Sequence, residues 1–287
     1  MGESHRYGVW EHILFPPTRR NSHKLARHLN GKTVLITGAS FGIGEQVALA
    51  LADTGARLIL VGRTTDKLRQ VRDSVVDMGG EATMIPADLT NSDDLLRLFE
   101  VLDALENGID IVISNAGRSL RRSIEDSLDR YHDVTRTMAI NFQAPVQLAL
   151  HLIPVLRSRQ GHFLHVSGVN VLLAPPPRWA AYQASKAAFD QWFRSTSPEL
   201  AASGIATSSI YLPLVKTRMI EPTETYRNMP AMSPQHAARI ICRQILSRSR
   251  AFKPWWTIFG ELGSVLFRTI WESILARDIK KTHAKHS

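Results

Sequence analysis

The sequence contains a single cysteine, Cys242, among 287 residues. One thiol cannot form an intramolecular disulfide or a cysteine-built metal site, so the composition favours a reducing compartment. Long apolar segments are also missing, because no uninterrupted apolar run reaches the length that spans a bilayer. Residues 1–30 lack the continuous apolar core of a secretion signal. We therefore expect a cytoplasmic protein without a cysteine-built metal site.

Acidic residues are in deficit, with 26 Asp and Glu against 35 Lys and Arg and a net charge of +9. The basic residues are scattered along the whole chain and form no dense run of the kind that indicates nucleic-acid binding. We therefore expect no nucleic-acid partner. An anionic small molecule, an acidic carrier and an anionic membrane surface fit the charge equally well, and the charge alone does not choose among them.

Alternation of apolar runs with helical segments predicts the fold from residue 31 onward. The runs are β-branched and nearly all apolar, which is typical of parallel strands buried on both faces. Strands are expected at residues 33–37, 57–61, 82–86, 109–114, 162–167 and 206–211. Helices are expected at residues 42–54, 65–78, 92–105, 127–156, 179–203 and 233–247. The sequence predicts an α/β protein with a single Rossmann-type doubly wound parallel sheet and helices on both faces.

Two segments lie outside this alternation, so we divide the chain into three parts. These are an N-terminal extension at residues 1–30, a dinucleotide-binding and catalytic domain at 31–250, and a C-terminal amphipathic helix with a basic tail at 251–287. In the last part, the apolar residues that recur at helical spacing are Trp255, Ile258, Phe259, Leu262, Leu266, Ile270 and Ile274. This apolar face either covers the domain's own core or a dimer partner, closes over an apolar substrate, or lies in the plane of a membrane as a peripheral contact.

A glycine-rich turn follows the first expected strand and leads into a helix. It reads Gly38-Ala39-Ser40-Phe41-Gly42-Ile43-Gly44. Glycines there allow a pyrophosphate to approach the backbone, and the free N–H groups at the start of the helix favour its negative charge. Tight strand-to-helix turns also use glycine for steric reasons alone. The position after the first buried strand favours a dinucleotide site.

The end of the second expected strand indicates which dinucleotide binds. An acidic residue there would bind the ribose hydroxyls of NAD, whereas a basic residue can pair with the additional phosphate of NADP. The sequence has Gly62 followed by Arg63. The guanidinium can make a bidentate contact with the phosphate, and Gly62 carries no carboxylate to repel it. We therefore expect NADP, and NAD less; the alternative is a solvated arginine that begins a helix.

Tyr182 and Lys186 are four residues apart in a helical segment, so both side chains emerge on one face. We expect the ammonium to stabilise the phenolate and to lower the pKa of Tyr182, which would let the hydroxyl exchange a proton while a hydride moves. Ordinary helix surfaces supply many such pairs. This pair therefore indicates an active site only in combination with the other motifs.

Four ordered motifs together make residues 31–245 resemble the short-chain dehydrogenase/reductase family. Residues 37–44 are similar to the family's cofactor turn, and Asp88-Leu89 to its adenine contact. Asn115-Ala116-Gly117 is similar to the motif at the end of its fourth strand, and the segment from Tyr182 to Lys186 to its active-site pair.

The resemblance implies roles for further residues. Asn141 falls where the family has a helix asparagine that supports a proton relay, and Ser167 where its serine hydrogen-bonds the substrate oxygen. Val215 and Thr217 would contact the nicotinamide amide, and Lys186 would also hold the nicotinamide ribose. Helices at 127–156 and 179–203 correspond to common family interfaces, which implies a homodimer or homotetramer.

Two positions depart from the family pattern. Leu212-Pro213 stands where Pro-Gly usually follows the sixth strand, which puts the local backbone near the nicotinamide in doubt. Phe41 stands where many NADP-preferring relatives have a basic residue. Arg63 would therefore recognise the phosphate nearly alone.

The implied reaction is hydride transfer between nicotinamide C4 and a carbonyl carbon, for which no metal ion is needed. Residues 209–223 are similar to a segment of bacterial reductases of long acyl chains, including fatty acyl, fatty aldehyde and mycolate-precursor reductases. The leading hypothesis is thus an NADP(H)-dependent oxidoreductase that reduces a keto or aldehyde group on a lipid-like or acyl substrate. The alternatives are oxidation of a secondary alcohol such as a steroid, and dinucleotide sensing without turnover.

Overall fold

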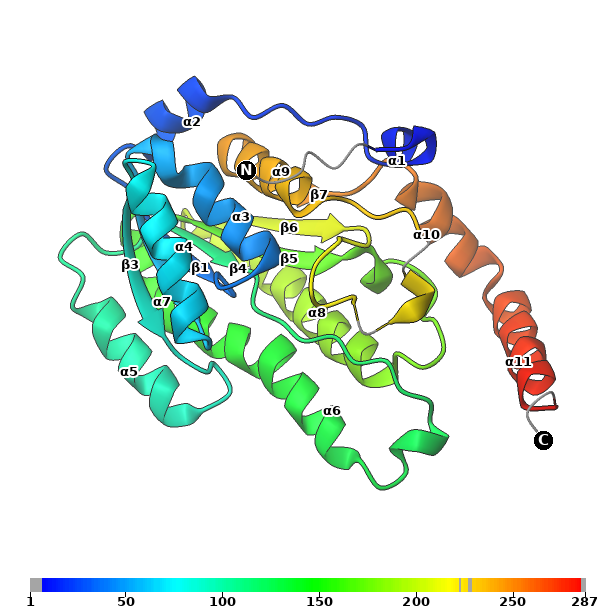
Figure 1. The fold of residues 1–287 in the computed structure, drawn as a ribbon. Helices are drawn as coiled ribbons and strands as arrows, with labels where there is room; N and C mark the ends of the chain where they lie inside the picture. The colour runs from blue at the N-terminus through cyan, green and yellow to red at the C-terminus, as the bar shows by residue number, and fades with distance from the viewer. Residues whose placement is uncertain (1–6, 222, 227–228, 285–287) are drawn as a thin grey trace.

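The computed structural model describes residues 7–221, 223–226 and 229–284 of the chain (Figure 1). Its centre is a seven-stranded parallel sheet in the order β3-β2-β1-β4-β5-β6-β7. The strands are β1 Thr33–Thr37, β2 Arg57–Gly62, β3 Glu81–Pro86, β4 Ile111–Ser114, β5 His162–Gly168, β6 Ala206–Leu212 and β7 Ala251–Phe252. The strand order reverses between β1 and β4, and in sheets of this type a crevice for ligands opens at that point.

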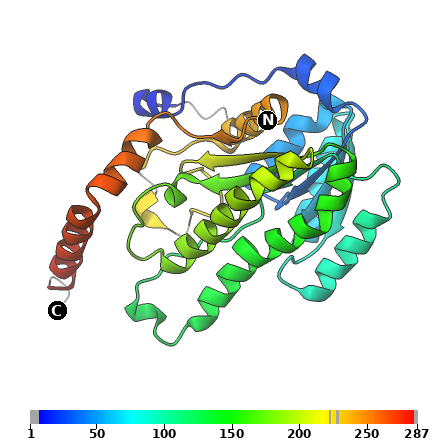
Figure 2. The ribbon, with the colours of Figure 1, turned by 180° about the vertical axis from the view of Figure 1, so that it is seen from behind.

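Helices cover both faces of the sheet. On one face lie α3 Gly42–Leu51, α4 Thr65–Asp77 and α9 Pro234–Ser247, and on the other lie α5 Ser92–Asp103, α6 Tyr131–Met138, α7 Ala144–Ser158 and α8 Ala180–Ala202 (Figures 1 and 2). Successive residues of β1 serve two separate cores, because Val34 packs on the α3 side and Leu35 on the α5 side. All five residues of β1 are buried. The predicted doubly wound α/β fold is confirmed.

Strand β7 and the start of one helix differ from the prediction. Strand β7 is only two residues long and pairs with β6, so its sequence shows no apolar run to detect. The helix expected from residue 127 begins at Tyr131 and contains a π-helical turn, Ala139–Gln143. Its whole length, Tyr131–Ser158, is long and apolar enough to cross a membrane. Buried side chains such as Leu152 pack in the α5-side core, which identifies it as a core helix.

The N-terminal segment crosses the α9 side of the molecule as two short helices, α1 Val9–Leu14 and α2 Ser22–Leu29 (Figure 1). Leu25 and Leu29 of α2 are fully buried in the α3-side core. The hydroxyl of Tyr7 lies 3.0 Å from Nδ1 of His236, and it accepts a hydrogen bond from the backbone N–H of Ser233. The N-terminal segment is thus fastened to the start of α9.

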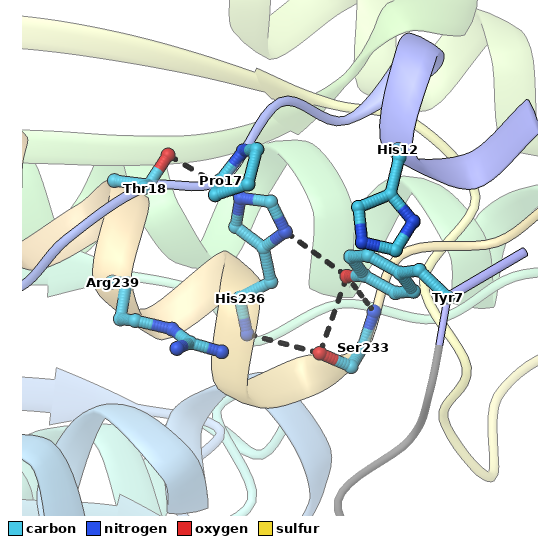
Figure 3. Close-up of a pocket in the computed structure, with 7 residues that line it drawn as sticks. All are labelled: Tyr7, His12, Pro17, Thr18, Ser233, His236 and Arg239. Carbon is cyan, nitrogen blue, oxygen red and sulfur yellow. Dashed lines mark hydrogen bonds between the residues drawn. The ribbon is translucent and has the colours of Figure 1, made fainter. Parts of the chain in front are cut away.

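A surface pocket of about 440 Å³ lies along this contact (Figure 3). It is lined by Tyr7, His12, Pro17, Thr18, Ser233, His236 and Arg239. Burial lowers the pKa of His236 to about 4, so its ring is neutral at neutral pH. No residue that the sequence assigns to the active site lines this pocket.

The C-terminal segment forms two helices instead of the predicted single one. Helix α10 spans Thr257–Leu266 and α11 spans Arg268–Ala284, with the break at Phe267. Helix α10 lies at the edge of the body of the molecule, and α11 projects away from it in the two opposite views (Figures 1 and 2). The apolar residues of α10 are largely exposed, so this face does not cover the domain's own core. The division of the chain into three parts stays a prediction.

Candidate active site

The glycine turn after β1 is tightly packed against the end of β4. Gly38 and Gly42 have positive φ angles of 67° and 61°, which glycine adopts without strain. A Cβ atom on Gly44 would lie 2.3 Å from the carbonyl oxygen of Gly38, and one on Gly38 would lie 2.9 Å from Cα of Ala116. The backbone N–H of Gly42 donates to the carboxylate of Glu45, so the start of α3 already holds a negatively charged oxygen.

Asn115 and Thr37 join β1 to β4 where the strand order reverses. The amide of Asn115 donates to the carbonyl oxygens of Thr37 and Gly38, at 3.1 and 3.3 Å. The hydroxyl of Thr37 accepts from the backbone N–H groups of Asn115 and Ala116, each at 3.0 Å. These bonds fix the turn that would face the pyrophosphate.

Ser40, Gly62 and Arg63 meet beside the glycine turn and fit the adenosine end of a dinucleotide. The Ser40 hydroxyl is buried, and it has no hydrogen-bond partner within the part of the chain that the structure describes. It lies 2.3 Å from the position that a Cβ atom on Gly62 would take. The side chain of Arg63 is 67% exposed and lies 3.5 Å from the carboxylate of Asp88. A hydroxyl without a partner and an accessible guanidinium suit a phosphate.

Of the other residues predicted to contact the cofactor, some are packed in the interior and one faces the glycine turn. Leu89 is buried in the α5-side core, and Ile43 packs partly against the other core, so both side chains serve packing. Thr217 faces the glycine turn, because its Cγ2 is 3.0 Å from the position that a Cβ atom on Gly42 would take. Val215 is buried and forms a bridge to Met232.

Phe41 has a cationic neighbour that the sequence did not reveal. The guanidinium of Arg218 lies over its ring, 5.2 Å from the centroid.

Leu212, the first residue of the Leu212-Pro213 departure, is the last residue of β6 and is buried. Its partner in the neighbouring strand is Gly168.

Asn141 lies in the π-helical turn and connects the end of β4 to α8. Its Oδ1 accepts from the backbone N–H of Arg118 at 2.9 Å, and its Nδ2 donates to the Arg118 carbonyl oxygen at 2.8 Å. The same Nδ2 donates to the Ser185 hydroxyl at 3.0 Å, which in turn donates to the carbonyl oxygen of Tyr182 at 2.8 Å. Asn141 therefore positions the helix turn that carries Tyr182. Gly117 must be small, because a Cβ atom there would lie 3.0 Å from Oδ1 of Asn141.

Lys186 is buried beneath the end of β5. Its Nζ donates to the carbonyl oxygen of Val166 at 3.1 Å, next to Ser167 in the chain. Burial lowers the pKa of Lys186 to about 8, although the nearby carboxylate of Asp190 raises it. The ammonium is thus charged at neutral pH and close to losing its proton under mildly alkaline conditions.

The pKa of Tyr182 is raised, whereas the sequence predicted that Lys186 would lower it. Burial raises the pKa of Tyr182 to about 12, and the neighbouring Tyr226 adds to the shift. Burying a phenolate is costly in the protein without ligand, and burial is the largest cause of this shift. The hydroxyl therefore keeps its proton at neutral pH and is suited to donate it.

Ser167 supplies a second polar group at the same edge of the sheet. It pairs with Tyr211 in the register between β5 and β6. Its hydroxyl is buried and has no hydrogen-bond partner among the described residues. A buried hydroxyl without a hydrogen-bond partner is unfavourable unless a ligand supplies that partner.

Sequence reasoning missed several residues around Tyr182. The ring of Trp179 contacts Tyr182 edge-on at 5.7 Å and stacks on Tyr226 at 5.6 Å, so aromatic rings line this side of the site. Asn170 and Gln183 exchange hydrogen bonds and fasten the segment after β5 to α8. Ser185 stood inside the recognised motif, which was the one available signal; the aromatic contacts join distant segments and leave no local pattern.

The fold and this site define a Rossmann-type oxidoreductase, and comparisons with known proteins identify the family. The family model described as short chain dehydrogenase matches residues 32–228. The chain belongs to the short-chain dehydrogenase/reductase family, as its motifs predicted.

Similar proteins include reductases and oxidoreductases of bacteria. A fatty acyl-CoA reductase of Acinetobacter baylyi is 39% identical over 241 residues, which cover 84% of this chain and 80% of the relative. An uncharacterised oxidoreductase of Mycobacterium tuberculosis is 40% identical over 248 residues, covering 83% and 71%. Among solved structures, an angucycline C-6 ketoreductase with bound NADP is 26% identical with a TM-score of 0.71, covering 78% of this chain and 94% of that chain.

Proposed function

We propose that this enzyme uses NADPH to reduce a carbonyl group on a long-chain acyl substrate. The observation that carries the proposal is the buried Ser167 hydroxyl, which lacks a partner among the described residues at the strand end that also receives the Lys186 ammonium. A substrate carbonyl oxygen would accept a hydrogen bond from this hydroxyl. Tyr182 adds a phenol that still holds its proton, because burial keeps its pKa near 12.

NADPH, when bound, supplies the hydride that reaches the carbonyl carbon. Ser167 donates a hydrogen bond to the carbonyl oxygen and orients it. Tyr182 transfers its proton to the same oxygen as negative charge develops there. The positive charge of Lys186 then stabilises the phenolate that remains. Asn141, through Ser185, holds the first turns of α8 so that these groups keep their positions.

Three observations support the acyl substrate. The relative from Acinetobacter baylyi is named a fatty acyl-CoA reductase and matches most of both chains. Residues 209–223 resemble the corresponding segment of bacterial long-chain reductases. Trp179 and the apolar segment 171–174 after Ser167 are buried or half-buried at the site edge of the sheet.

A chain-length series tests the substrate class. NADPH consumption is followed by nicotinamide absorbance with aldehydes, ketones and acyl-CoA thioesters of short, medium and long chains, and with a steroid ketone. We expect kcat/KM to rise about tenfold for each pair of methylene groups that the site buries. A flat series, or a preference for the steroid, would contradict an acyl substrate. Tight NADPH binding without turnover on any carbonyl would instead indicate a dinucleotide sensor.

Arg63 is the residue we assign to the NADP phosphate. Replacing it (Arg63→Ala) should weaken NADPH binding by at least about tenfold, because a charge-assisted hydrogen bond to the phosphate is lost. NADH lacks that phosphate, so its affinity should change much less. Calorimetric titration with both dinucleotides measures the difference. Arg69→Ala removes an exposed, ion-paired arginine of α4 and is the matched control; equal weakening of NADPH and NADH by Arg63→Ala would exclude the assignment.

A further inference from the structure

The C-terminal helix α10 presents its large apolar residues to solvent. We define the outer stripe as Trp255, Ile258, Phe259, Leu262, Val265 and Leu266. These residues are between 53% and 78% exposed. Trp255 lies just before α10, and the spacing of the other five places them on one face of the helix. We propose that the outer stripe docks this protein on the surface of a bilayer that contains anionic lipids.

The opposite face of α10 packs on the body of the protein. Thr257 is 1% exposed. A Cβ atom on Gly260 would lie 2.6 Å from the side chain of Leu173, and the Ser264 hydroxyl accepts from the backbone N–H of Ala174 at 2.8 Å. A surface helix of a globular domain normally buries its apolar face. Here the small and polar face is inward and the apolar face outward, so folding of the single chain does not account for the stripe.

The N-terminal helix α1 extends the same apolar surface. The indole N–H of Trp255 donates to the carbonyl oxygen of Ile13 at 3.0 Å, which places the start of α10 against the end of α1. The two helices lie side by side in both views (Figures 1 and 2). Val9 is 77% exposed and Trp10 is 72% exposed. Phe267 at the break and Ile270, Trp271 and Ile274 of α11 continue the surface, and they are 46% to 59% exposed.

Charge favours a lipid surface over a second copy of the chain. Residues 250–281 contain six Lys or Arg and three acidic residues, a net charge of +3. Two of the acidic residues, Glu261 and Glu272, are held in ion pairs with basic residues of the same segment. A symmetric interface would bring two positively charged segments together, whereas anionic headgroups are complementary to them. The exposed cations Lys280 and Lys281 follow the apolar part of α11.

Residue types and length indicate how the helix would lie. Exposed tryptophans, such as Trp10, Trp255 and Trp271, favour the boundary between headgroups and hydrocarbon. Helix α10 has 10 residues and is about 15 Å long, half the hydrocarbon thickness of a bilayer. It is therefore too short to span and suited to lie in the plane of the surface.

Docking would bring the candidate active site to the membrane. Leu173 and Ala174, which α10 contacts, belong to the segment that follows Ser167 at the end of β5. An acyl substrate would then pass from the bilayer to the site without crossing water. This last step rests on the proposed function, whereas lipid binding does not, and the two are tested separately.

Co-sedimentation with vesicles tests the docking surface. The full chain is mixed with vesicles of phosphatidylcholine containing phosphatidylglycerol, and with vesicles of phosphatidylcholine alone. We expect binding to the anionic vesicles that weakens with added salt and without phosphatidylglycerol. The triple variant Phe259→Gln, Leu262→Gln, Leu266→Gln should lose at least about tenfold in partitioning, because three apolar side chains no longer enter the bilayer. Glutamine keeps the helix propensity high.

A matched variant and two measurements make the result decisive. Val76→Gln, Leu96→Gln, Val101→Gln changes three exposed apolar residues on α4 and α5, and it should bind vesicles like the unmodified protein. Thermal unfolding and NADPH binding should be unchanged in both variants. Absence of vesicle binding by the unmodified protein, or equal binding by the α10 variant, would overturn the proposal. Sedimentation velocity showing a dimer that the α10 variant dissociates, with no vesicle binding, would assign the stripe to a second copy instead.

Discussion

Replacing Tyr182 with phenylalanine (Tyr182→Phe) is expected to lower kcat/KM for carbonyl reduction by about a thousandfold while NADPH still binds. The substitution removes the hydroxyl and keeps the ring that packs against Trp179. Because the pKa of Tyr182 is raised to about 12, the hydroxyl carries its proton throughout the neutral range. Removing that proton leaves the developing alkoxide without an acid. Steady-state rates and NADPH titration measure the two effects separately.

The control is Tyr131→Phe, which removes a hydroxyl from a 75% exposed tyrosine at the start of α6. This variant should keep the turnover of the unmodified protein. If Tyr182→Phe also kept it, the proton would have to come from another group. A loss of NADPH binding in Tyr182→Phe would show instead that the ring position, and not the proton, had been disturbed.

The second large effect is expected for Lys186→Met, which keeps the length of the buried side chain and removes its charge. We expect kcat/KM for NADPH to fall by at least about a hundredfold, because the phenolate left by Tyr182 loses its nearby cation. The ammonium also donates to the carbonyl oxygen of Val166 beside Ser167. Its loss would therefore loosen the strand end as well.

The pH dependence distinguishes a role in catalysis from a role in packing. Burial lowers the pKa of Lys186 to about 8, so the group is charged below that pH and neutral above it. kcat/KM for NADPH reports groups of the free enzyme, and it should decline as the pH rises through about 8. Lys186→Arg, which stays charged, should move this decline to higher pH. A decline near pH 8 that persists unchanged in Lys186→Met would assign it to another group.

The strands could be predicted because burial on both faces leaves a local record in the sequence. Every residue of β1 is buried, and its apolar run is visible without any knowledge of its neighbours. Strand β7 leaves no such record, because Ala251 and Phe252 are extended only through pairing with Ser209 and Ile210 of β6. The break at Phe267 between α10 and α11 also escaped prediction, since the apolar spacing continues across it.

The site could be predicted in composition but not in its electrostatics. The ordered motifs named Tyr182 and Lys186, and the family resemblance added Asn141 and Ser167. Hydrogen bonds join Asn141 to Tyr182 through Ser185, and Lys186 to the carbonyl oxygen of Val166. The sequence pair alone suggested a lowered pKa for Tyr182, whereas burial raises it. Depth of burial depends on how distant segments pack, and spacing within one helix contains no information about it. For the same reason, periodicity identified every residue of the outer stripe except Val265, but not the outward direction of the stripe.

The π-helical turn at Ala139–Gln143 lets one continuous helix serve both the core and the site. Such a turn accommodates one residue more than the regular helical ladder. It therefore offsets the phase of α6 from that of α7, so that Leu148 and Leu152 face the core while Asn141 reaches Arg118 and Ser185. Deleting a single residue here would restore a regular helix and direct the amide elsewhere. A local irregularity in the backbone thus allows one helix to serve two geometric demands that an ideal helix could not meet together.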